Sequence, residues 1–182
     1  MASTTHIRGL DASLRKLKQI DPKLEREAKK RLKDDVKPIV QDAKALIPGS
    51  PPLSRWVAPK GAGADGQGVV RAGGSRLPIW SSGPAKRRIG VSIVRKRRSG
   101  YTGKMLLIRV RQMDAAGAVF DIAGRRNAGN PLDKSLKSAG FGGASRGMWP
   151  AAMRHKDAVH DSIKASVHEV ERQINAELRR VA

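Results

Sequence analysis

The sequence predicts an α+β fold: an antiparallel sheet of about three to four strands, flanked by an N-terminal and a C-terminal amphipathic helix, with a long Gly/Pro-rich loop. Two patterns predict it. Near both ends of the chain, apolar residues recur at spacings of three and four, as on one face of a helix. In the middle they alternate with other residues, as in strands. We expect the 182 residues to form a single domain, residues 1–182.

The first predicted helix spans residues 21–47. Asp21 is suited to cap it, and Pro22 fits the first helical position. Pro38 lies inside the apolar stripe and is expected to bend or split the helix. A shorter stripe over residues 7–17 predicts a preceding helix.

An extended loop is predicted for residues 48–84, because proline and glycine are frequent there and no periodicity continues. Residues 61–66 contain the spacing Gly-x-Gly-x-x-Gly. A dinucleotide-binding fingerprint needs a preceding strand and a following helix, and neither pattern is present. We therefore interpret this segment as a loop.

A three-stranded β-meander is predicted for residues 88–123. Residues 88–95, 104–111 and 118–123 alternate with a period of two, and residues 96–103 are interpreted as a hairpin loop. A loop follows over residues 124–148. A second helix is predicted for residues 151–178 from its apolar stripe. Trp149 is expected to pack the start of this helix against the core.

Composition excludes several classes of protein. Cysteine is absent, which excludes disulfides, zinc ribbons and thiol catalysis. No apolar run reaches the roughly 20 residues of a membrane helix, so no membrane partner is expected. The N-terminal residues have no apolar stretch of the secretory kind. A protein made in the cytoplasm is the simplest expectation.

The sequence contains no convincing catalytic or metal-binding pattern. His155, His160 and His168 fall in the C-terminal helical pattern, but no two of them have the i, i+4 spacing of a helical metal site. Ser81 and Ser82 near Lys86 do not form a recognisable nucleophile–base pair. We therefore expect no enzyme activity, no metal and no cofactor.

The main candidate for function is a basic block. Residues 66–113 contain twelve Lys and Arg and no Asp or Glu, in a chain whose formal net charge is +21. Such charge can bind phosphates, with an affinity that falls as salt rises. It can equally be a solvated surface or pair with acidic residues of neighbouring subunits. The residues expected to face a partner or DNA are Arg55, Trp56, Arg76, Trp80, Lys86, Arg87, Arg88, Arg95, Lys96, Arg97, Arg98, Arg125 and Arg126.

Two tryptophans in this set have two interpretations. Trp56 and Trp80 could fill the core at the ends of the predicted loop. They could equally be buried in an adjacent subunit, because Trp and Arg are enriched at interface centres.

Several short motifs, in their order along the chain, resemble one family. They are Asp21-Pro-Lys-Leu with the basic helix to Pro48, Pro52-Leu-Ser-Arg-Trp56, Arg76-Leu-Pro-Ile-Trp80, Gly117-Ala-Val-Phe-Asp-Ile-Ala-Gly-Arg-Arg126 and Met148-Trp-Pro-Ala-Ala152. This order resembles the minor tail-component, or tail-completion, family of long-tailed bacteriophages, in the form found in phages of actinobacteria. The segment 117–124 matches the central motif of that family, with Asp121 in the acidic position.

The resemblance implies a structural viral protein in the neck of the virion, assembled in the host cytoplasm. Such a head–tail connector, tail-completion or tail-terminator protein forms a ring around the DNA channel, and a ring of six is expected. The implied partners are other copies of the chain and neighbouring stopper, adaptor or tail-tube proteins. The basic block is expected to face either acidic residues of these neighbours or double-stranded DNA in the channel. The alternative is a free nucleic-acid-binding protein that uses the basic hairpin of residues 86–111.

Overall fold

The computed structural model describes residues 22–58, 69–72, 75–97 and 104–181. The chain divides into two compact units, each described by itself. The first contains Ile39–Gly90 and Val110–Arg154. The second contains Ala2–Pro38, Val91–Arg109 and His155–Ala182. The fold is α+β, as predicted, and its strands form two separate two-stranded sheets. The single domain expected for residues 1–182 stays a prediction.

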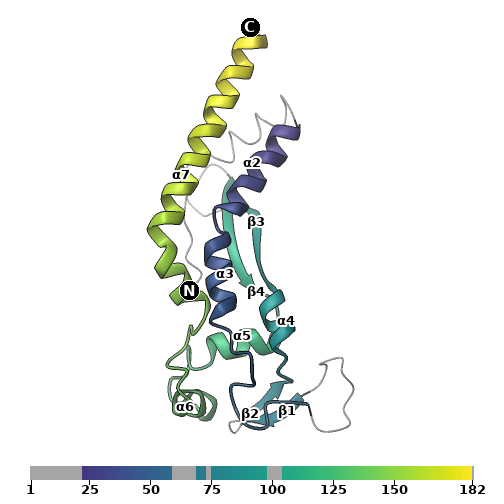
Figure 1. Ribbon diagram of the computed structural model, residues 1–182, viewed down its shortest axis with the longest axis vertical. Helices are drawn as coiled ribbons and strands as arrows, with labels where there is room; N and C mark the ends of the chain where they lie inside the picture. The colour runs from purple at the N-terminus through teal and green to yellow at the C-terminus, as the bar shows by residue number, and fades with distance from the viewer. Residues whose placement is uncertain (1–21, 59–68, 73–74, 98–103, 182) are drawn as a thin grey trace. The chain divides into compact units, whose positions relative to one another are not determined.

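The N-terminal helical pattern forms two helices, α2 (Pro22–Asp34) and α3 (Lys37–Ala45), joined by a turn (Figure 1). This confirms the expected split, because Pro38 is the second residue of α3, where the missing N–H is tolerated. The predicted cap Asp21 and the predicted helix of residues 7–17 lie outside the described residues.

The second unit brings the turn after α2 against the helix α7 (Met148–Val181). Asp35 accepts hydrogen bonds from the hydroxyls of Ser162 and Ser166, both at 2.7 Å. The buried side of α7 in this unit consists of Val159, Ile163, Val167, Val170 and Ile174. Their spacings are those of the predicted apolar stripe, which explains why this helix could be recognised from the sequence.

The loop predicted for residues 48–84 contains secondary structure, so that prediction is wrong in part. Strands β1 (Val69–Ala72) and β2 (Ser75–Pro78) pair antiparallel, and the short helix α4 (Ser82–Arg87) follows. Each strand has four residues, which is too short to produce a clear period in the sequence. Residues 59–68 lie outside the described part of the chain.

Strands β3 (Ile89–Arg97) and β4 (Lys104–Gln112) pair in the second sheet, as predicted for the first two strands of the meander (Figure 1). The predicted third strand at residues 118–123 is wrong, because α5 (Ala115–Ile122) covers these residues. The Asp114 carboxylate caps α5 by accepting a hydrogen bond from the Gly117 amide at 2.9 Å. Ala116 and Phe120 are then buried one helical turn apart.

The loop predicted for residues 124–148 contains the helix α6 (Pro131–Ser138), so that prediction is also wrong in part. Asn130 caps α6 through a 2.8 Å bond from the Asp133 amide to its side chain, and Pro131 opens the helix. Helix α7 begins three residues before the predicted start. Trp149 is 38% exposed near that start, so it does not pack into the core as expected.

A row of aromatic side chains forms part of the core of the first unit. The ring centroids of Trp56 and Trp80 lie 5.3 Å apart, those of Trp80 and Phe120 5.6 Å, and those of Phe120 and Phe141 5.3 Å. The Trp56 indole N–H donates to the Pro78 carbonyl at 2.6 Å. This row joins four parts of the first unit, which are the segment before β1, the segment between β2 and α4, helix α5 and the segment after α6.

Candidate interaction surface

The segment 117–124 fixes the start of α7. Asp121 on α5 is buried, and its Oδ1 accepts hydrogen bonds from the backbone amides of Gly147 at 2.7 Å and Met148 at 3.1 Å. A carboxylate at a helix N-terminus satisfies free N–H groups and stabilises the helix dipole. The acidic position of this motif therefore holds two helices together.

Arg146 is the second buried charge at this junction. One terminal nitrogen donates to the carbonyls of Phe120 and Ala123, both at 2.9 Å. The other donates to Asp133 Oδ1 at 2.9 Å and to the Gly142 carbonyl at 3.1 Å. A buried guanidinium with four acceptors fixes geometry rather than offering charge to a partner.

The buried carboxylate of Asp133 has three hydrogen-bond or ion-pair partners among the described residues. Its Oδ2 lies 2.8 Å from the Lys137 ammonium and accepts from the Gly129 amide at 3.0 Å, while Oδ1 binds Arg146. The hydrogen bond from Lys137, then that from Gly129, lowers the pKa of Asp133 below its usual value of 3.8. Burial opposes this change, because it disfavours the charged form. The carboxylate is therefore ionised at neutral pH.

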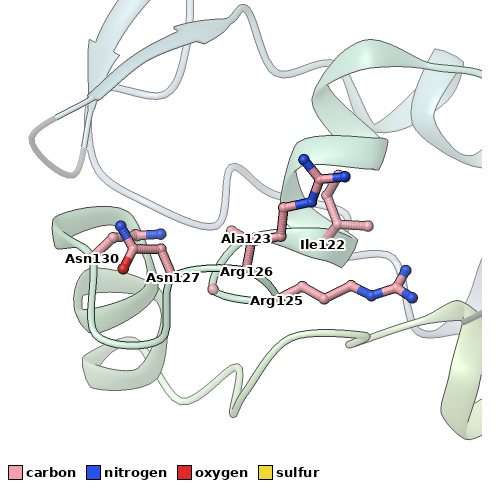
Figure 2. Close-up of a pocket in the computed structure, with 7 residues that line it drawn as sticks. Ile122, Ala123, Arg125, Arg126, Asn127 and Asn130 are labelled. Atoms are coloured by element: carbon pink, nitrogen blue, oxygen red, sulfur yellow. The ribbon is translucent and has the colours of Figure 1, made fainter.

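A pocket of about 590 Å³ lies at the loop between α5 and α6. Its lining residues are Ile122, Ala123, Gly124, Arg125, Arg126, Asn127 and Asn130. Figure 2 shows the guanidinium groups of Arg125 and Arg126 on the side of Ile122, with Asn127 and Asn130 at the other end beside α6. Both arginines are exposed. The pocket therefore offers cationic and amide hydrogen-bond donors to solvent.

The charge balance of the first unit is strongly positive. Its described residues include fourteen Lys and Arg, four Asp and no Glu. All four Asp have partners inside the unit: Asp42 pairs with Arg154 at 3.1 Å, Asp114 caps α5, and Asp121 and Asp133 are buried as described. The remaining basic residues, which form no ion pair with a described residue, are Lys44, Arg55, Arg71, Arg76, Lys86, Arg87, Arg88, Arg111, Arg125, Arg126 and Lys134.

We call these eleven residues the basic surface. Most are exposed, and Lys44 and Lys86 are half-buried. Since the acidic groups of the same unit are already engaged, this surface has no internal charge to neutralise it within the described residues. Such a surface attracts polyanions or acidic proteins over a distance set by the ionic strength.

The exposed face of the β1–β2 hairpin contributes two of these residues. Arg71 and Arg76 are directly opposite in the register, and both are exposed. Val70 and Leu77, the next pair, are buried on the other face. Hydrophobic residues thus fix the hairpin to the core, and this places the two arginines side by side toward solvent.

The structure describes the placement of most of the predicted site residues. Arg55, Arg76, Lys86, Arg87, Arg88, Arg125 and Arg126 all belong to the basic surface. Arg55 has a positive φ of 69° in the turn before Trp56. Arg95, Lys96 and Arg97 belong to β3, but their side chains lie outside the described part of the chain, as does Arg98.

Trp56 and Trp80 are correctly interpreted as core residues, and their alternative placement in a partner subunit is wrong for these side chains. Their exposed fractions are 0% and 5%, because they pack on one another and on Phe120. Trp80 Nε1 is buried with no hydrogen-bond partner among the described residues.

Arg71 and Arg111 belong to the basic surface but were not among the predicted site residues. Arg71 could have been found, because Gly73-Gly74 between two short segments is a signal for a tight hairpin. Asp133 and Arg146 were missed for another reason. They are thirteen residues apart in a segment without periodicity, so only the tertiary fold shows that they pair.

None of the described residues form a group of three or more His, Cys, Asp or Glu that could hold a metal ion. Within the same residues, no helix has the length and apolarity needed to cross a membrane. No protein-family model matches the chain, no curated protein matches it, and no solved structure matches it at a significant level.

Proposed function

We propose that this chain is a structural protein of a phage neck, which joins head to tail as a ring around the DNA channel. The observation that carries the proposal is the basic surface of the first unit. All four described acidic residues of that unit have internal partners, whereas eleven basic residues form no ion pair with a described residue. A protein of this kind needs an anionic partner or a neighbouring subunit to neutralise its charge.

The motif that resembles tail-completion proteins supports a structural role. Phe120 fills the core, Asp121 caps α7, and Gly124 adopts a φ of 90° next to the Asp133 carboxylate. Each residue positions the backbone rather than a reacting group. A motif used this way fits an assembly protein better than an enzyme.

A ring gives the basic surface a role. Closed rings form through heterologous contacts, in which two different faces of each copy meet. Repeating the basic surface around the ring, with six copies as the expected number, produces a positive collar. This collar would face channel DNA or an acidic ring of stopper, adaptor or tail-tube protein. The expected location is the head–tail junction of the virion.

The test is to purify virions and look for the polypeptide by mass spectrometry, then reconstruct the neck by electron microscopy. We expect to find the chain in every particle. We also expect ring-shaped density at the portal–tail junction into which α7 and strands β3 and β4 can be fitted. Absence of the polypeptide from purified virions would rule the proposal out.

A free nucleic-acid-binding protein is the second candidate. Lys86, Arg87, Arg88 and Arg111 of the predicted basic hairpin are present on the basic surface, which favours it. Both candidates predict duplex binding that weakens as salt rises. They differ in location: a free protein would bind DNA in infected cells and be missing from particles.

A further inference from the structure

The exposed pair Arg71 and Arg76 contradicts an ordinary rule of sheet stability. Directly opposite residues on one face have Cβ atoms about 4.5–5.5 Å apart, and like charges in these positions are destabilising. The hairpin pairs only four residues on each strand, and the burial of Val70 and Leu77 on its other face holds it together against this repulsion. No acidic side chain among the described residues forms an ion pair with either arginine.

We propose that Arg71 and Arg76 form a phosphate clamp that binds the backbone of double-stranded DNA. Two guanidinium groups on adjacent strands can approach one phosphodiester from both sides, each donating two parallel hydrogen bonds to its oxygens. Bound phosphate replaces the repulsion between the arginines with two attractions. The clamp rests on the proposed function in one respect, because a protein of the phage neck would surround a channel that contains DNA.

The described face around the clamp favours nucleic acid over an acidic protein. Val69 and Pro78 are the other residues on this face, and no aromatic side chain is among them. Protein interfaces depend on a buried apolar or aromatic centre surrounded by polar groups, whereas contacts to DNA phosphates need only well-placed donors. Eight of the eleven residues of the basic surface are arginine, the side chain best suited to phosphate.

The clamp can be tested by measuring binding of a 24-base-pair duplex to the full chain across a range of salt concentrations. The variant is Arg71→Gln with Arg76→Gln. The matched control is Lys156→Gln with Lys164→Gln, which also removes two exposed basic residues, but on α7 and outside the basic surface. Losing the contact to the one clamped phosphate should lower the magnitude of the salt slope by about 0.9 and weaken binding at 0.1 M salt roughly tenfold or more. The control should change the slope by much less.

A second readout separates binding from folding. Arg71→Glu places opposite charges across the hairpin, so the Tm of the free protein should rise by about 1–2 °C while duplex affinity falls. A merely solvated arginine pair would give the rise in Tm without the loss of affinity, and this result would overturn the clamp. Equal slope changes in the two double variants would overturn the clamp as well. They would show that the basic residues attract DNA through the overall positive charge of the protein and not through a specific contact.

Polyglutamate of matched charge serves as the competitor for an acidic protein partner. We expect polyglutamate to displace the wild-type protein from the duplex poorly. Efficient displacement would overturn the choice of DNA and indicate that an acidic protein binds the two arginines. The virion experiment remains independent. If the chain is present in particles but the double variant keeps the wild-type slope, only the clamp fails. If the slope falls but the chain is missing from particles, only the neck assignment fails.

Discussion

Arg146 and Asp133 form an ion pair of 2.9 Å in which the two side chains are 2% and 1% exposed. The same guanidinium binds carbonyls at the end of α5, so the pair joins α5, α6 and the segment that leads to α7. Removing two charges from water costs free energy, so such a pair stabilises the fold only when its remaining donors and acceptors are hydrogen-bonded. The two terminal nitrogens of Arg146 donate four hydrogen bonds, while Nε has no partner among the described residues.

Replacing Arg146 by methionine should be severely destabilising. The substitution keeps much of the side-chain volume, but the Asp133 carboxylate loses one buried partner, and the carbonyls of Phe120, Ala123 and Gly142 lose the Arg146 donor. We expect the Tm to fall by roughly 10 °C, as for other broken buried pairs. Thermal unfolding followed by circular dichroism measures this. The control Arg125→Met removes an exposed arginine and should move the Tm by no more than about 1 °C. Equal effects of the two changes would contradict the structural role of Arg146.

Replacing Asp121 tests the cap of α7. Asp121→Ala removes the acceptor for the Gly147 and Met148 amides and should cost about 1–2 kcal/mol in the free energy of unfolding. Asp121→Asn keeps one acceptor oxygen and should cost less. Urea denaturation gives both values from the midpoint and slope. Asp157→Ala, on the exposed side of α7, is the control and should be nearly neutral. Equal stability of Asp121→Ala and the wild type would show that the cap is dispensable.

The sequence predicted those elements that are long and bury one face. The apolar stripe of residues 151–178 and the alternation of residues 88–95 and 104–111 correspond to α7, β3 and β4. Burial of one face imposes the same period in sequence and structure, so these elements could be recognised.

The error at residues 118–123 has a physical cause. Phe120 and Ile122 are two residues apart and flank the polar Asp121, as in a strand. Six residues cover less than two helical turns, however, and cannot separate the helical period from the strand period. The deciding features lie outside the segment. Asp114 caps the helix, and Gln112 links its start to α4 through bonds to the Asp114 amide and the Ala85 carbonyl.

The candidate site was predicted only as a set of charges. Charge along the sequence identified Arg76, Arg87, Arg88, Arg125 and Arg126, because their exposure needs no knowledge of the fold. Which acidic residues remain available to neutralise them depends on tertiary contacts. Only the structure shows that Asp121 and Asp133 are engaged internally.

Gly124 should not accept a side chain. Its φ is 90°, in the left-handed region, and a Cβ there would overlap the carboxylate of Asp133. Gly124→Ala should therefore lower the free energy of unfolding by about 2 kcal/mol or more. Gly143→Ala is the control, because a Cβ at Gly143 meets no atom within 4 Å. Chemical denaturation compares the two, and a tolerated Gly124→Ala would mean that the loop between α5 and α6 can rearrange.

The lowered pKa of Asp133 predicts acid sensitivity. Folding binds the ionised form more strongly, so the stabilisation is fully present above the unfolded pKa, near 3.8, and is lost as pH falls through the lower folded pKa. Stability measured by urea denaturation should thus change little from pH 7 to 5 and fall below about pH 4.

Lys137→Met removes the largest cause of the lowered pKa of Asp133, so it should reduce stability at pH 7 and make the loss of stability below pH 4 shallower. Lys134→Met, on an exposed position of the same helix, should leave that profile unchanged. If Lys137→Met and the wild type lose stability in parallel on acidification, another carboxylate controls the transition, and Asp34, whose pKa is lowered by its hydrogen bond from Lys37, is the first to test by Asp34→Asn.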